Sequence, residues 1–244
     1  GVEIIKKLIQ EYDIVVEQFR PNVMARLGLG YEDLKVINPR LIYCAVTGYG
    51  QQGVYQNRAG HDLNYLAIAG VLDYTGRKDT GPMPLPIQAA DITGGLYAVT
   101  GILAAVIHRQ QTGQGQFIDI SLTDAAFSLQ ALTAPAALVA NQQPKPETDV
   151  LNGGTFYDCY QTADERYLSI GGLEPQFFMA FANAIGRPDL IPLSIRHDAE
   201  AVNIVKTAIK EAITQKTLAE WQAIFAPIEA CVEPVLSFAE ACQH

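Results

Sequence analysis

The chain has 244 residues, 49% of them hydrophobic and 18% charged, which is enough apolar material for one large domain or two unequal ones. Its net charge of −9 argues against a general nucleic-acid binder or an anionic-membrane binder, because phosphate contacts need clustered Lys and Arg. The four cysteines form no CxxC pair and are too sparse for a disulfide framework, which favours a reducing, cytoplasmic location.

No membrane contact is expected, because no apolar run reaches the ~20 residues that a spanning helix needs. The stretch over residues 96–107 is short and ends at His108 and Arg109, so it predicts a buried helix. The chain starts without Met inside an amphipathic pattern, and it stops inside a helical pattern that has no Gly or Pro terminator. Both ends are therefore expected to be truncated.

The first elements predict an α/β fold. The pattern predicts a helix at 1–11, a short buried strand at 13–17, a helical turn at 23–27, a helix at 31–37 and a strand at 41–46. Two strands separated by a helix imply a parallel pair with a right-handed crossover.

The next elements extend this unit. A helix is expected at 62–72, and a Gly/Pro-rich loop follows it. Asp91 is expected to be the N-cap of a long apolar helix that runs to Arg109. A strand is expected at 117–122, and a helix at 123–139 is so poor in charge that it should be buried.

A polar segment at 141–150 predicts a linker, so we expect a large domain at 1–145 and a small one at 146–244. The small domain is expected to be α+β. Its predicted elements are strands at 156–161 and 167–171 and helices at 175–185, 199–214 and 217–225.

Three blocks contain chemically versatile residues, and each also has a purely structural interpretation. His61, in Gly-His-Asp-Leu-Asn-Tyr, is by itself better explained as a partly buried capping histidine. Asp91, in Asp-Ile-Thr-Gly-Gly, is by itself an ordinary N-cap. Glu174 precedes Pro175 and fits the entrance of a helix whose first position is proline. No single block decides the function.

In their order along the chain, however, these blocks resemble CoA-transferase family III, also called the CaiB/BaiF family, and most closely its α-methylacyl-CoA racemase branch. Further matching segments extend the resemblance over nearly the whole chain. They are Val-Glu-Gln-Phe-Arg-Pro at 16–21, Arg-Leu-Gly-Leu-Gly at 26–30, Thr-Gly-Tyr-Gly-Gln at 47–51, Thr-Gly-Gln-Gly-Gln at 112–116 and Leu-Asn-Gly-Gly at 151–154.

The resemblance implies a Rossmann-like large domain, here without its N-terminal part, a small domain without its C-terminal segment, and an intertwined homodimer. It implies that His61 and Asp91 are the acid/base pair and that Glu174 orients His61, within or across subunits. It also implies that the main-chain N–H of Asp62 stabilises an enolate oxygen. This pairing makes chemical sense, because inverting a stereocentre needs one group to remove a proton and another to return it on the opposite face.

The same resemblance places Arg20 and Arg26 near the CoA diphosphate and Tyr65 in the CoA channel. A surface arginine or a core tyrosine remains the alternative for each. CoA is then part of the thioester substrate, with no prosthetic group and no metal expected.

Three functions remain open. The first is a racemase that interconverts (R)- and (S)-2-methylacyl-CoA through an enolate. The second is a family III CoA-transferase in which Asp91 acts as nucleophile. The third is an inactive fragment that at most binds CoA or a partner. The presence of His61 and Glu174 favours the racemase, because the transferase chemistry needs no histidine base.

Overall fold

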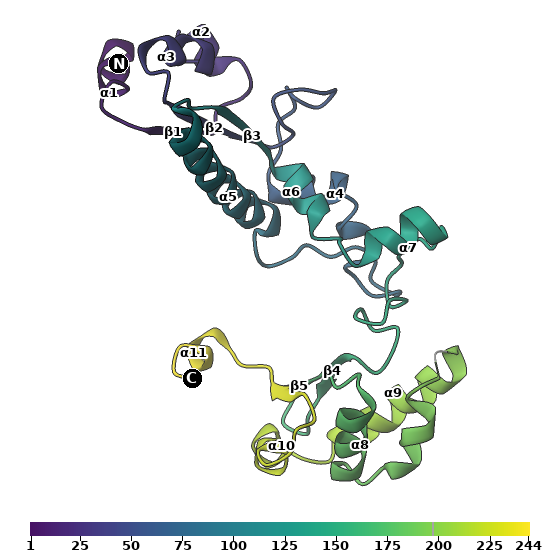
Figure 1. Cartoon of the computed structure of the whole chain (residues 1–244). Coiled ribbons are helices and arrows are strands. Elements are labelled where there is room, and N and C mark those ends of the chain that lie inside the picture. The colour runs from purple at the N-terminus through teal and green to yellow at the C-terminus, as the bar shows by residue number, and fades with distance from the viewer. Residues whose placement is uncertain (197) are drawn as a thin grey trace. The chain divides into compact units, whose positions relative to one another are not determined.

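The computed structural model describes residues 1–196 and 198–244, which form two compact units, Gly1–Gln143 and Pro144–His244 (Figure 1). Each unit has its own sheet and its own hydrophobic core. We therefore describe each unit by itself.

The first unit contains a three-stranded parallel sheet in the order β1-β2-β3. The strands are β1 (Ile14–Glu17), β2 (Ile42–Thr47) and β3 (Phe117–Ser121), and the parallel pairing predicted for the first two is confirmed. The predicted burial of β1 is wrong, because β1 is an edge strand with one neighbour and Val16 is 59% exposed.

Helices cover both faces of this sheet. The core on one face joins α1 (Val2–Leu8) and α3 (Tyr31–Ile37) to Leu41 and Tyr43 of the β2 region, with the short α2 (Val23–Arg26) beside α3. The other face is covered by α5 (Ala89–Thr112), which packs on β2 and β3 (Figure 1). The mixed α/β class predicted from the sequence is thereby confirmed.

Small residues let α5 approach its neighbours closely. Gly94, Ala98, Gly101 and Ala105 follow a four-three-four spacing, which puts them on one face of a helix. A Cβ atom at Gly94 would lie 2.2 Å from the Cδ2 atom of Leu122, and one at Gly101 would lie 3.0 Å from Ile118. The close packing of α5 against the rest of the unit thus requires glycine or alanine at these positions.

The opposite face of α5 is apolar and exposed. By length and composition, α5 is long and apolar enough to cross a membrane, and 22% of the residues in its apolar 18-residue stretch are buried. The expectation that no segment reaches this length was wrong, because the helix begins before residue 96, where small residues such as Ala89, Ala90, Gly94 and Gly95 continue the apolar stretch. The burial predicted for residues 96–107 holds for one face only: Ala98 and Ala105 are buried, whereas Leu96, Val99, Leu103 and Ile107 are exposed.

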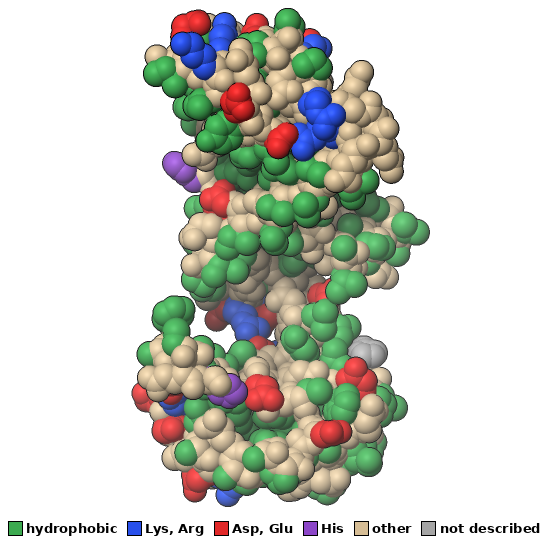
Figure 2. Space-filling view, turned by 60° about the vertical axis from the view of Figure 1, so that its left-hand side comes forward, with side chains coloured by type: hydrophobic (Ala, Val, Ile, Leu, Met, Phe, Trp, Pro, Cys, Tyr) green, Lys and Arg blue, Asp and Glu red, His purple; other side chains and the backbone are tan. Residues whose placement is uncertain are grey.

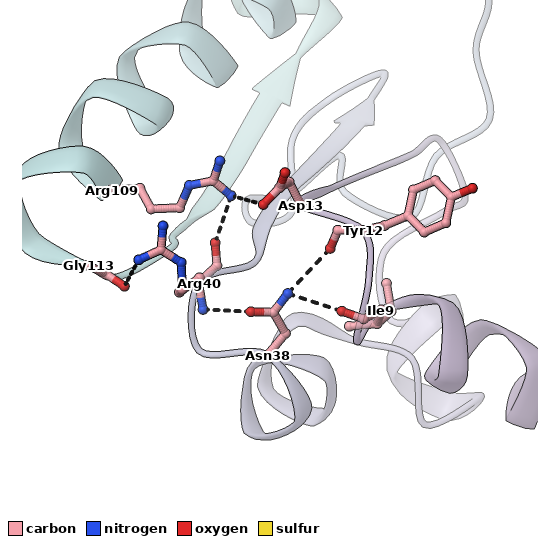
Figure 3. Close-up of polar contacts among 7 residues, drawn as sticks. All are labelled: Ile9, Tyr12, Asp13, Asn38, Arg40, Arg109 and Gly113. Carbon is pink, nitrogen blue, oxygen red and sulfur yellow. Dashed lines mark hydrogen bonds and ion pairs between the residues drawn. The ribbon is translucent and has the colours of Figure 1, made fainter.

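A polar network fastens the amino-terminal edge of the sheet (Figure 3). Arg109, near the end of α5, forms an ion pair of 2.7 Å with Asp13 and donates to the Arg40 carbonyl. The Asn38 amide donates to the carbonyls of Ile9 and Tyr12. These contacts join α1, α3 and α5 before the strands begin, so the opposite, carboxyl edge is the one left for a site.

The segment predicted as one buried helix at 123–139 is two helices, α6 (Leu122–Ser128) and α7 (Thr133–Ala140), and α7 contains no buried residue. The break allows the buried Gln130 amide to donate to the Ala69 carbonyl over 2.7 Å. Pro135 lies in the first turn of α7, where a missing N–H costs no hydrogen bond, so a new helix start fits this position.

The second unit has a three-stranded antiparallel sheet, β4 (Asp158–Gln161), β5 (Tyr167–Ile170) and β6 (Val232–Pro234). Sequence patterns missed β6, which is only three residues long. Helices α8 (Pro175–Ala184), α9 (Ala199–Ile213) and α10 (Leu218–Phe225) agree with the prediction, and the shorter elements are η2 (Pro188–Leu193) and α11 (Phe238–Ala241). The core is rich in stacked and tilted aromatic rings.

Glu240 ties α11 to the turn after β4. Its carboxylate accepts hydrogen bonds from Ser237 and from both terminal nitrogens of Arg166, at 3.2 and 2.8 Å. These contacts, those of Ser237 first, lower the pKa of Glu240 to about 2 from its ordinary value of 4.5.

Because the pKa of Glu240 is lower in the folded than in the unfolded protein, its ionised carboxylate stabilises the fold above about pH 4.5. This contribution to the free energy of unfolding is lost as the pH falls towards 2. We expect Glu240→Gln to be less stable than the wild type at neutral pH, with the gap closing in acid. Thermal unfolding at several pH values measures this gap. Glu233→Gln in β6 is the matched control, and a gap independent of pH contradicts the prediction.

Candidate functional site

Two helices of the first unit begin beside each other and carry most of the predicted catalytic residues. His61 is the N-cap of α4 (Asp62–Ile68), which a 3-10 turn, η1 (Leu72–Tyr74), follows. Asp91 lies in the first turn of α5. Both side chains are exposed, and α4 packs against α5 and α6 (Figure 1).

The carboxylate of Asp62 connects the two helix starts. Its Oδ2 atom accepts hydrogen bonds from the backbone N–H of Ala90, at 2.7 Å, and of Asp91, at 3.1 Å. The prediction that Asp91 is the N-cap of α5 is therefore wrong: Gln88 occupies that position, and Asp91 is the third helical residue. A cap supplied by a distant residue cannot be read from local sequence, because local rules consider only neighbours along the chain.

Electrostatics also couple these residues. Partial burial, followed by the charge of Asp62, raises the pKa of Asp91, and His61 acts in the opposite direction. A carboxyl with a raised pKa gives and takes protons closer to neutral pH than an ordinary aspartate does. The direction of this shift is the one that favours an Asp91 carboxyl able to take part in proton transfer.

A pocket of about 380 Å³ opens at the carboxyl ends of β1 and β2. Residues 18–21, 47–49 and 58–61, together with Gln56, Asn64 and Tyr65, line it. Loops after parallel strands are the usual ligand site of open α/β sheets. Three predicted residues, Arg20, His61 and Tyr65, therefore line one pocket. Asp62, which does not line it, follows His61 and accepts a hydrogen bond from the backbone of Asp91.

Tyr65 is both part of the core and part of the pocket wall. It is 8% exposed, and its hydroxyl donates a hydrogen bond to the Gly60 carbonyl. A Cβ atom at Gly48 would lie 2.4 Å from its ring, and one at Gly60 2.7 Å. Burial first, then Tyr49 and Asp91, raise the pKa of Tyr65, whereas Arg20 lowers it. The two glycines thus allow the loops to close on the tyrosine ring.

Two further pocket residues were missed by the sequence analysis. Arg58 lines the pocket, as Arg20 does, and its guanidinium carbon lies 4.7 Å from the centre of the Tyr55 ring. Thr47, at the end of β2, is 7% exposed, and its hydroxyl has no hydrogen-bond partner among the described residues. A buried donor of this kind fits a ligand group in the pocket. The end of a parallel strand was the signal that could have pointed to it.

The Asp62 backbone is also available. Asp62 is the first residue of α4, and its N–H donates to no acceptor within the described parts of the chain. A free N–H at a helix start carries a partial positive charge that favours an anion. This geometry is compatible with the enolate-stabilising role expected for it.

Two predicted residues are not among those that line this pocket. Arg26, at the end of α2, is exposed and is not among the residues that line it. Glu174 belongs to the second unit, where it is the exposed N-cap of α8 and makes no side-chain capping bond. Its role towards His61 stays a prediction.

Residues 1–196 and 198–244 contain no group of three or more His, Cys, Asp or Glu side chains placed to hold a metal ion. Of the described cysteines, only Cys44 is buried. On the face shown in Figure 2, basic side chains occur in small groups among acidic ones. That face therefore shows no broad basic surface.

Comparisons with known proteins agree with these observations. The sequence model described as CoA-transferase family III matches residues 1–244. The chain is 37% identical to the alpha-methylacyl-CoA racemase of Mus musculus over 248 residues, which is 100% of this chain and 64% of the racemase. It thus spans less than two thirds of the length of that relative.

Other relatives have different activities. The succinyl-CoA:glutarate CoA-transferase of Mus musculus is 32% identical over 226 residues, covering 89% of this chain and 52% of the transferase. The crystal structure of a CaiB/BaiF family protein from Brucella suis matches with a TM-score of 0.83 and 30% identity, covering 100% of this chain and 65% of that protein.

Proposed function

The chain belongs to CoA-transferase family III, and from this premise we propose that it inverts the α-carbon of 2-methylacyl-CoA thioesters by removing and returning a proton. The family contains both racemases and CoA-transferases, so the family alone supports an enzyme that acts on CoA thioesters. The finer assignment depends on the site.

The observation that carries the proposal is the bond between the two helix starts. Asp62 follows His61 in sequence and holds the backbone of Asp91, so a histidine and a carboxyl that interact electrostatically stand beside one pocket. In the reaction, one of them removes the α-proton, the electron pair moves to the thioester oxygen, and the other returns a proton to the opposite face. The free N–H of Asp62 would stabilise the oxygen anion.

Exchange of the α-proton tests this function directly. A chiral 2-methylacyl-CoA incubated with the protein in deuterated water is expected to incorporate deuterium and to lose optical purity at comparable rates. NMR measures the incorporation, and chiral chromatography measures the inversion. Acyl-CoA binding without either process would contradict the proposal and would support a chain that only binds CoA.

A CoA-transferase is the second candidate, favoured by the transferase relatives and by the exposed position of Asp91. In that reaction the Asp91 carboxylate attacks the thioester carbonyl and CoA leaves as the thiolate, which forms a mixed anhydride. Acyl-CoA-dependent trapping at Asp91 with hydroxylamine or borohydride, without α-proton exchange, would establish this function in place of the racemase.

The pocket cations support CoA as the ligand, because guanidinium groups bind phosphate oxygens well. We expect Arg58→Ala to weaken CoA binding about tenfold, the loss expected for one charge-assisted hydrogen bond. Arg20→Ala should have a similar effect. Calorimetry with CoA measures both.

Arg40→Ala is the matched control for the two arginine variants. Arg40 precedes β2, at the amino end of the strand whose other end forms the pocket. The Arg40→Ala variant should bind CoA with the same affinity as the wild type. Equal weakening in all three variants would contradict a phosphate site at the pocket.

We also propose a homodimer in the cytoplasm. Its support is the exposed apolar surface of α5, α6 and α7, since soluble proteins rarely leave large apolar patches uncovered. The exposed side chains are Leu96, Val99, Leu103, Ile107, Phe127, Leu132, Leu138 and Val139. Analytical ultracentrifugation tests the dimer, and a monomer at micromolar concentration would contradict it.

A further inference from the structure

We infer that the Asp62 side chain is a positioning residue for Asp91, which holds the first turn of α5 and places a negative charge beside the reacting carboxyl. This inference rests on the proposed proton-transfer function for its catalytic meaning. Its physical content, a cap and a charge, can be measured without any turnover.

The capping geometry is specific. Ala90 and Asp91 are the second and third residues of α5. The N–H groups at these first positions of a helix have no acceptor within the helix itself. Both donate to the Oδ2 atom of Asp62, whereas Gln88, the N-cap residue, makes no side-chain capping bond. Asp62 is therefore the side chain that satisfies this helix start.

The cap fixes Asp91 relative to His61. The hydrogen bond at 3.1 Å holds the backbone of Asp91 itself, not merely that of a neighbour. Asp62 is covalently next to His61, whose own backbone N–H donates to the Asn64 amide oxygen at 3.1 Å. The two proposed reacting residues are thus both connected to Asp62, His61 by the peptide bond and Asp91 by a hydrogen bond.

The charge has a separate effect. The ionisable groups whose charges couple with Asp91 are His61 and Asp62 at the start of α4 and Tyr65 one turn later. Asp62 disfavours ionisation of Asp91 and His61 favours it, in addition to the larger effect of burial. The charge of Asp62 thus adds to the effect of burial and favours the protonated form of the Asp91 carboxyl.

Two substitutions separate the cap from the charge. Asp62→Asn keeps an oxygen that accepts the two N–H groups and removes the charge, and Asn caps helices as well as Asp does. Asp62→Ala removes both. Asp124→Asn, in the first turn of α6, is the control for removing one exposed negative charge from the same unit.

The first readout is structural and does not depend on activity. Amide hydrogen exchange of Ala90 and Asp91 is expected to stay slow in Asp62→Asn and to become at least about tenfold faster in Asp62→Ala. Carbon-detected NMR titration of the Asp91 carboxyl, assigned with Asp91→Asn, is expected to give a lower pKa in Asp62→Asn than in the wild type. Asp124→Asn should match the wild type in both measurements.

The second readout is the pH profile of α-proton exchange. The acidic limb reports the protonation of Asp91, so it should move to lower pH in Asp62→Asn. In Asp62→Ala, misplacement of Asp91 should lower the rate roughly 10- to 100-fold. An unchanged Asp91 pKa in Asp62→Asn, or full amide protection in Asp62→Ala, overturns the inference. A wild-type protein without proton exchange would instead refute the proposed function, and the NMR results would still decide the role of Asp62.

Discussion

Replacing His61 by Ala is expected to lower the rate of α-proton exchange by about 10²- to 10⁴-fold, the usual contribution of one acid/base group. The fold should survive, because the His61 side chain is exposed and makes no capping bond to α4. Deuterium incorporation into a chiral 2-methylacyl-CoA, followed by NMR, gives the rate. Circular dichroism and thermal unfolding check that the protein is folded.

His108→Ala is the matched control, since it removes an exposed histidine from the far end of α5. Its exchange rate should equal that of the wild type. Retention of the wild-type rate in His61→Ala would remove His61 from the mechanism. Loss of exchange with continued acyl-CoA-dependent trapping at Asp91 would show that the carboxyl reacts without the histidine, as the transferase chemistry requires.

Asp91→Asn is expected to lower proton exchange by a similar factor of about 10²- to 10⁴-fold, because an amide neither removes nor returns the α-proton. CoA binding should change little, since Asp91 does not line the described pocket. Comparing the exchange rate with the calorimetric affinity for CoA separates chemistry from binding.

Asp124→Asn serves again as the control for a lost carboxylate. A parallel loss of exchange and of CoA affinity in Asp91→Asn would contradict the assignment, because it would indicate damage to the binding site. Exchange at the wild-type rate would exclude Asp91 as an acid or base.

Much of the fold could be predicted because hydrophobic periodicity acts locally. The boundaries of α3 and the parallel pairing of β1 with β2 follow from short patterns and from the helix between two strands. Burial was harder to predict. The strand β1 and the helix α7 are apolar but largely exposed, because the sequence shows that a segment is apolar and not which surface covers it.

Predictions for the site failed where a contact joins distant segments. The sequence predicted that Asp91 lies at the start of a helix and that the Asp91 side chain caps this helix. The structure assigns this capping to Asp62, which lies 29 residues earlier. Thr47 and Arg58 were missed for a related reason, since their importance lies in facing one pocket together with Arg20 and His61.

The sequence by itself therefore determined the family, the alternation of helices and strands in the first unit, and the residue types available for acid/base chemistry. Only the tertiary structure decided which residues share a pocket and that the Asp62 carboxylate connects two helix starts. The physical reason is that helix and strand propensities depend on neighbours a few residues away. A hydrogen bond between segments depends instead on how the whole unit packs, and the link between Asp62 and Asp91 is such a bond.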